Sequence, residues 1–167
     1  LQWGAPDECW GPAEMACHWT VGVVTLLLLL VGGGTVMASS CADPPEAPSF
    51  QLDSLYGRWH EVGKIQTAGG AFFERDCVCT QLVYTPTSPP SHDALVDNLC
   101  RDKTPSGRLL QLNATLTADP AKPGHFSQRF PVGPAASYNL IVLDEQYAVE
   151  YDCQHVLGIT NYCIHLM

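Results

Sequence analysis

The residues best suited to chemistry in this chain are its cysteines, its histidines and one pair of acidic residues. Glu150 and Asp152 share one face of a predicted strand, and a carboxylate pair can act in acid–base catalysis. We instead expect them on a solvated outer face. The histidines after residue 40 show no metal-ligand spacing, and they are His60, His92, His125, His155 and His165. The sequence contains no nucleophile elbow, phosphate loop or His-Glu-x-x-His motif. We therefore predict no catalysis, no metal and no cofactor.

An apolar run near the start of the chain predicts a secretory signal. Residues 21–31 are continuously apolar, and three glycines and a group of small residues follow them before Cys41. We expect 15–40 to be a signal peptide beginning at Met15, with 1–14 as upstream or non-native sequence. The alternative is a membrane anchor at 21–38, which just reaches the ~18 residues that span a bilayer. We take 41–167 as the folded domain.

Cysteines are frequent after this signal, which predicts disulfides in a secreted protein. The six are Cys41, Cys77, Cys79, Cys100, Cys153 and Cys163. A hairpin formed by 78–85 and 94–101 places Cys100 opposite Cys77 or Cys79, and this choice stays open. The Cys77-x-Cys79 pair could instead bind a metal, but no second close pair accompanies it. Asn113-Ala114-Thr115 is a glycosylation sequon, consistent with an extracellular location.

The charge of the domain bears on its partners. All eight Lys and Arg residues and 14 of the 17 acidic residues follow position 40, which gives 41–167 a net charge of −6. An acidic domain without basic clusters argues against a nucleic acid or an anionic membrane surface as the partner.

Short β-like segments separated by Pro- and Gly-containing turns fill the domain. Residues 107–117 alternate, with Leu110, Leu112, Ala114 and Leu116 on one face. No segment of 12 or more residues has helical periodicity. The pattern predicts an all-β sandwich or up-and-down barrel. The predicted strands are 57–65, 78–85, 94–101, 107–117, 124–130, 137–143, 147–154 and 159–167.

Three segments resemble the lipocalin family, and most closely its apolipoprotein D-like and bacterial members. Gly57-Arg58-Trp59 matches the Gly-x-Trp at the start of the first barrel strand. The segment 138–153, with Asp144 and Tyr147 in its turn, resembles the second family motif, where an Asp turn joins two late strands. Residues 41–45 (CADPP) resemble a mature N-terminus within the family. The resemblance covers 41–167 and implies an eight-stranded antiparallel up-and-down barrel.

The resemblance also has consequences for the cysteines and the chain ends. It implies a Cys41–Cys153 disulfide that holds the Pro-rich lead against the barrel. Members of the family continue to an Arg over the Gly-x-Trp indole and then to a helix, so we expect a fragment, with the last strand and the C-terminal helix truncated. Cys79 matches a family cysteine that bonds to this tail, so we expect it unpaired or bonded to Cys100.

For the barrel interior, the resemblance and the strand parity together give candidate ligand contacts. They are Leu82, Tyr84, Phe126, Tyr138 and Leu140. We expect Trp59 to fill the closed end instead of touching ligand.

The function implied is that of a secreted, extracellular carrier of a small hydrophobic ligand, such as a fatty acid, sterol, retinoid or carotenoid. One alternative is a lipocalin-scaffold enzyme acting on a lipid or xanthophyll, which would need a reactive group such as Cys163 in the cavity. Another is a membrane-tethered lipocalin held by residues 21–38.

Overall fold

A single antiparallel sheet forms the protein in this computed structural model, which describes residues 2–3, 9, 40–48, 50–87 and 93–167. Its strand order is β1-β3-β10-β9-β8-β7-β6-β5-β4-β2, and consecutive strands from β4 to β10 are neighbours. Two short 3-10 helices are η1 (Leu52–Ser54) and η2 (Phe72–Glu74). The strands are β1 (Gln2–Trp3), β2 (Gly57–His60), β3 (Gly63–Gln66), β4 (Cys77–Pro86), β5 (Ala94–Asp102), β6 (Leu109–Ala118), β7 (His125–Arg129), β8 (Ala136–Leu143), β9 (Ala148–Val156) and β10 (Ile159–Leu166).

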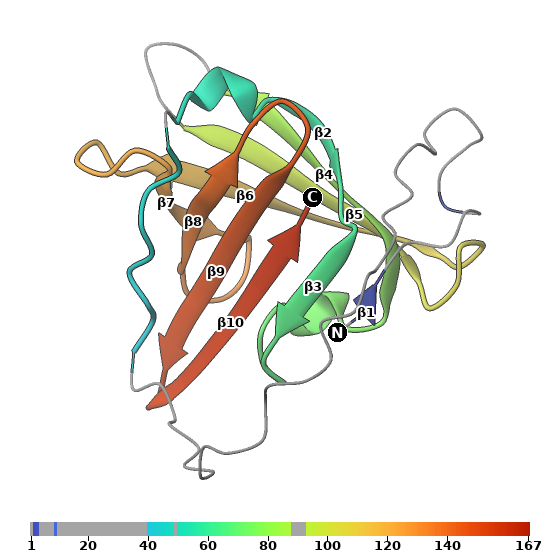
Figure 1. The fold of residues 1–167 in the computed structure, drawn as a ribbon. Coiled ribbons are helices and arrows are strands. Elements are labelled where there is room, and N and C mark those ends of the chain that lie inside the picture. The colour runs from blue at the N-terminus through green and yellow to red at the C-terminus, as the bar shows by residue number, and fades with distance from the viewer. Residues whose placement is uncertain (1, 4–8, 10–39, 49, 88–92) are drawn as a thin grey trace, which may run out of the picture.

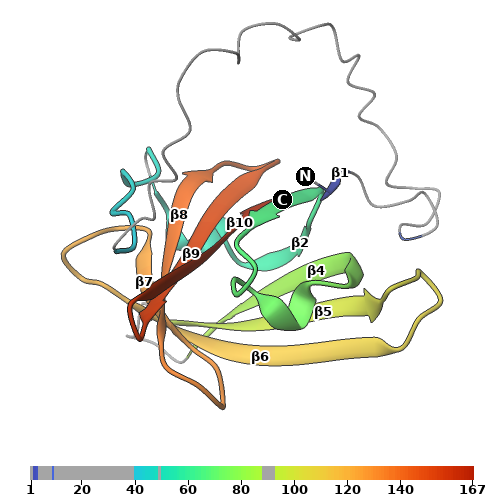
Figure 2. The same cartoon turned by 90° about the horizontal axis from the view of Figure 1, so that it is seen from below.

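The predicted strand 57–65 is divided into β2 and β3, which lie at opposite ends of the strand order, with only the two-residue β1 beyond β3. β2 pairs with β4, and β3 pairs with β10. Only Glu61 and Val62 separate them. The Glu61 amide donates to the Thr80 carbonyl on β4 at 3.0 Å, and the Val62 amide donates to the Leu166 carbonyl on β10 at 2.8 Å. This break brings the two ends of the sheet together and accounts for one of the two strands beyond the eight predicted, and β1 is the other. Figures 1 and 2 show the curled sheet, with β8–β10 forming one wall and β4–β6 the other.

Alternation along the strands decides which side chains enter the barrel. On β6, Ala114 and Leu116 are buried while Asn113 and Thr115 are exposed, as predicted. The buried apolar side chains gather at one end of the barrel, with Leu55, Tyr84, Leu116 and Tyr138 among them. Figure 2 shows η2 between the two walls. The inward face of β9 runs from the apolar core to polar surroundings, in the order Ala148, Glu150, Asp152 and Gln154.

The Pro-rich lead crosses the outside of β9. Cys41 is bonded to Cys153, with Cα atoms 5.7 Å apart, which is the pairing implied by the resemblance. The Ala42 amide donates to the Tyr151 hydroxyl at 3.0 Å. This contact explains why Tyr151 is buried on the outer face of a strand.

The expectation for Cys79 is wrong. Cys77 bonds to Cys100, and Cys79 bonds to Cys9, a residue of the segment that we excluded from the fold. A register shift between Val78 and Gln81, where Cys79 has a positive φ of 55°, brings Cys77 to the inner face, on which Cys100 also lies. A β-bulge of this kind changes the face that a side chain takes, so alternation counted from Tyr84 does not predict that Cys77 is the partner of Cys100.

The proposed membrane segment 21–38 and most of 1–40 lie outside the described residues. Within the part of the chain that the structure describes, no helix has the length and apolar character needed to cross a membrane.

Candidate ligand-binding site

The barrel contains a cavity of about 410 Å³ at the end opposite the apolar core. Its apolar wall includes Phe73, Leu112, Phe130 and Ala136. A second barrel cavity of about 290 Å³ shares Phe73 and Leu112 with it, so η2 and β6 border both, and the first is the larger cavity of these two. A more open hollow of about 610 Å³ lies beside β7 and β8, where Ser127 and Ser137 line it. The polar groups lining the larger cavity include Glu74, Asn98, Gln128, Asp152, Gln154, Asn161, Cys163 and His165.

The residues predicted to contact ligand lie mainly in the apolar core, at the other end of the barrel from this cavity. Leu82, Tyr84, Tyr138 and Leu140 are fully buried in the apolar core, and none of them lines either cavity. Phe126 packs edge-on against Tyr138, with ring centroids 5.9 Å apart. Phe126 also lines the hollow of about 610 Å³ beside β7 and β8. Contact of these residues with a ligand stays a prediction, because the walls of the two barrel cavities come from other side chains.

The residues that we assigned structural roles lie at the core end and in the β8–β9 turn. Trp59 is half-buried against the core, and its indole Nε1 donates to the Leu55 carbonyl at 2.8 Å. Asp144 Oδ1 accepts hydrogen bonds from the amides of Gln146 and Tyr147 at 2.7 and 2.9 Å. Gly57 has a φ of 120°, which side chains other than glycine's rarely tolerate.

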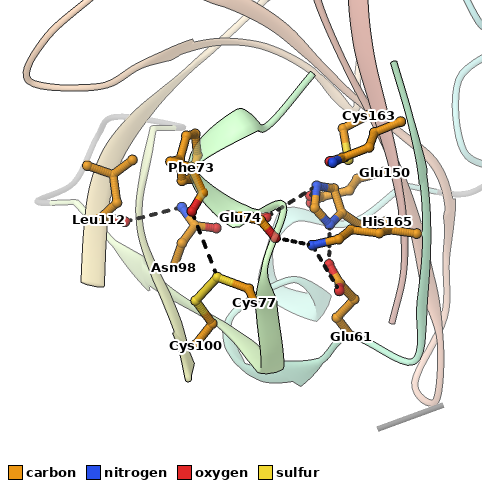
Figure 3. A network of polar contacts seen from close by, with 12 residues as sticks. Glu61, Phe73, Glu74, Cys77, Asn98, Cys100, Leu112, Glu150, Cys163 and His165 are labelled. Carbon is orange, nitrogen blue, oxygen red and sulfur yellow. Dashed lines mark hydrogen bonds and ion pairs between the residues drawn. A yellow bond between two sulfur atoms is a disulfide. The ribbon is translucent and has the colours of Figure 1, made fainter. Parts of the chain in front are cut away.

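A buried polar cluster separates the cavity from the apolar core, and its members are Glu61, Lys64, Glu74, Glu150, Asp152 and His165. Figure 3 shows Glu61, Glu74 and Glu150 around His165, with Cys163 beside it. The Lys64 ammonium donates to the Glu74 carbonyl at 2.7 Å and lies 3.7 Å from Glu61. Four carboxyl groups thus face one lysine and one imidazole.

The prediction that Glu150 and Asp152 lie on a solvated outer face is wrong, because both point into the barrel. Glu150 is 1% exposed. Its Oε2 accepts hydrogen bonds from the hydroxyls of Tyr84, at 2.9 Å, and Tyr138, and the two hydroxyls are 2.7 Å apart. The physical reason is that these phenols replace the water that an exposed carboxylate would bind. Asp152 follows on the same face and lines the cavity.

Burial and mutual charge shift the titration of this cluster. Burial raises the pKa of Glu74, and burial together with Glu150 raises that of Asp152 well above its usual range. Burial alone would lower the pKa of His165, but Glu150 and the hydrogen bonds to Cys163 and Glu61 raise it well above 6.5. Burial opposes ionisation of Glu61, yet its hydrogen bond to His165 and the positive charge of His165 give it a lowered pKa.

Sequence reasoning missed this cluster because its members are far apart along the chain. Glu61 follows β2, Glu74 ends η2, and Glu150 and His165 come from β9 and β10. Only the register of β9 against β10, in which Glu150 is opposite His165, brings the last two together. The one signal that could have placed Glu150 inside is that it alternates in step with Ala148, whose side chain faces the core.

In sequence, the chain is similar to apolipoprotein D of several mammals. No family model matches the chain. Apolipoprotein D of Mus musculus is 31% identical over 114 residues, which is 68% of this chain and 57% of that protein. Apolipoprotein D of Oryctolagus cuniculus is 30% identical over 123 residues, and that of Cavia porcellus 28% over 124, each covering 71% of this chain and 60% of the relative. The chain belongs to the lipocalin family. It spans less than two thirds of the length of these relatives.

Solved structures agree with the lipocalin fold. Lobster apocrustacyanin A1 superposes with a TM-score of 0.51 at 16% identity, covering 74% of this chain and 71% of that one. Apocrustacyanin C2 gives the same TM-score and coverage at 17% identity. Both are similar to this lipocalin in fold.

Proposed function

We propose that this lipocalin is an extracellular carrier that holds one small hydrophobic ligand in the larger cavity. The observation that carries the proposal is the cavity itself. Its volume of about 410 Å³ lies in the range of about 300–1,000 Å³ that small-molecule pockets occupy. Phe73, Leu112 and Phe130 offer apolar contact, while Asn98 and Gln128 could orient a polar group on the guest.

An extracellular location is supported by the cysteines and by Asn113. Disulfides are typical of secreted proteins, and the described residues hold three of them. Asn113 is exposed on the outer face of β6, where a glycan has room. Cleavage before Cys41 would remove Cys9, so in the proposed mature form Cys79 would be a free thiol or would bond to another cysteine.

The proposal is tested by a panel of ligands. A fluorescent fatty acid is titrated into the full chain, and unlabelled fatty acids, sterols, retinoids and carotenoids are then used to displace it. We expect saturable binding of one probe per chain and competition by one ligand class. A folded protein that binds no member of the panel would contradict the carrier function.

The enzyme alternative depends on Cys163, which lines the cavity and is a free, buried thiol. Burial raises the pKa of this thiol, and its Sγ lies 3.6 Å from Gln66 Oε1. A raised pKa reduces the reactive thiolate, which favours the carrier over the enzyme.

Cys163 should therefore react slowly with alkylating reagents in the folded protein. Burial raises the pKa of the thiol and keeps the reagent from it, so we expect alkylation to be clearly slower than in the urea-unfolded chain. Mass spectrometry of peptides containing Cys163 after timed iodoacetamide treatment measures both rates. Equal rates would restore the enzyme alternative.

A further inference from the structure

His165 lies at the centre of the buried polar cluster with its two ring nitrogens in different environments. Nδ1 lies 2.5 Å from Glu61 Oε2, so it is the nitrogen that carries a proton toward the carboxylate. Nε2 faces Glu150 Oε1 at 3.7 Å and Glu74 Oε2 at 3.9 Å. These separations are too long for hydrogen bonds. A histidine whose far nitrogen is held by a carboxylate is the usual arrangement of a metal-ligating histidine.

The carboxylates around Nε2 have oxygens to spare. Glu150 uses Oε2 for Tyr84 and Tyr138, which leaves Oε1 pointing at His165. Among the described residues, Asp152 Oδ1 and Glu74 Oε2 are buried and accept no hydrogen bond. Glu74 as a whole is only 4% exposed. A buried oxygen without a hydrogen bond is costly, and a cation would remove that cost.

The distances allow one ion to reach three of these residues. A nitrogen or oxygen of each of Glu150, Asp152 and His165 lies within 4.8 Å of the other two. Ligand atoms of a tetrahedral Zn²⁺ at about 2.0–2.2 Å lie about 3.3–3.6 Å from one another. The 3.7 Å from His165 Nε2 to Glu150 Oε1 is close to this spacing, and the separations to Asp152, which are at most 4.8 Å, would close by up to about 1.5 Å around the ion.

We propose that His165 Nε2, Glu150 Oε1 and a carboxylate oxygen of Asp152 form a binding site for a divalent transition-metal ion such as Zn²⁺. Glu61 acts as the positioning residue that holds the imidazole, and Glu74 supplies a nearby acidic group. One imidazole with two carboxylates suits Zn²⁺ and its first-row neighbours better than Ca²⁺, which takes oxygen ligands alone. Asp152 and His165 also line the cavity, so the ion can enter from there and face a bound guest.

The competing explanation is a metal-free ion pair, in which a protonated His165 is balanced by the surrounding carboxylates. Lys64 already supplies one positive charge to this cluster. The two explanations differ in whether Zn²⁺ binds, and in whether binding depends on Asp152 and Glu61.

Isothermal titration of Zn²⁺ alone into the full chain tests the proposal. We expect one ion per chain, abolished in His165→Gln and weakened at least about tenfold in Asp152→Asn. Glu61→Gln should weaken binding about 10- to 100-fold, as loss of a carboxylate behind a ligating histidine usually does. His155→Gln and Glu145→Gln are matched controls, since both residues are exposed. They should bind as the wild type does.

A spectroscopic titration with Co²⁺ keeps the test informative if one variant is unstable. The visible bands of Co²⁺ report its ligands, and they should be present in the wild type and in His155→Gln but need at least about tenfold more Co²⁺ to develop in Asp152→Asn. Wild-type protein that is folded and binds neither ion would overturn the proposal. Binding that persists unchanged in His165→Gln and Asp152→Asn would also overturn it, because the ion would then occupy an adventitious surface site.

Discussion

The double variant Cys41→Ser/Cys153→Ser is expected to lose about 4–5 kcal/mol of unfolding free energy. The disulfide closes a loop with a sequence separation of 112, and the chain-entropy model assigns about 4.8 kcal/mol to a loop of this length. The loss also frees the lead that covers Tyr151 on the outer face of β9. Urea denaturation followed by circular dichroism measures the change.

The matched control is the Cys77→Ser/Cys100→Ser variant. Its disulfide has a sequence separation of 23, for which the same model gives about 3.4 kcal/mol. We therefore expect the control to be more stable than the Cys41/Cys153 variant. The opposite order would mean that loop length does not govern the contribution of these disulfides.

Replacing Glu150 by Ala should destabilise the protein by about 3–5 kcal/mol, the usual effect of breaking a buried charged network. The change removes the acceptor of both the Tyr84 and Tyr138 hydroxyls and a carboxylate 3.7 Å from His165. It also leaves a cavity beside the core, which adds to the loss. Chemical denaturation gives the value.

Two further variants separate the network from general effects at this position. Glu150→Gln keeps the size and one acceptor oxygen, so its loss should be smaller than that of Glu150→Ala. Glu145→Ala, in the exposed β8–β9 turn, should change stability by no more than about 0.5 kcal/mol. A Glu150→Ala variant as stable as the wild type would show that the phenol–carboxylate contacts contribute nothing net.

Much of the fold could be predicted because strand alternation and turn residues are local signals. The face assigned to Ala114 and Leu116 and the late β8–β9 turn at Asp144 both follow from residues close in sequence. The break at Glu61–Val62 could not be predicted, because it depends on pairing with β4 and β10, which are distant in the sequence.

The site was predicted less well for a related reason. Parity correctly places Leu82 and Tyr84 inside the barrel, but it cannot say how far along the axis the apolar core ends and the cavity begins. That boundary is set by Glu74, which η2 places beside the cavity, and by Glu150, whose burial depends on Tyr138 of the neighbouring strand and on the distant Tyr84. A carboxylate is assigned to the surface by default unless such partners are known.

Ligand binding by a cavity-filling variant tests the central claim most directly. Ala136 lines the larger cavity, and Ala136→Trp should fill much of it, whereas Ala121→Trp adds the same side chain at an exposed turn. The ligand class that competes best in the panel experiment is titrated into each variant in a calorimeter, and only variants that melt cooperatively are compared. We predict that Ala136→Trp loses affinity at least about tenfold, the equivalent of 1.4 kcal/mol, while Ala121→Trp binds as the wild type does. Unchanged affinity in Ala136→Trp would contradict the assignment of the ligand to this cavity.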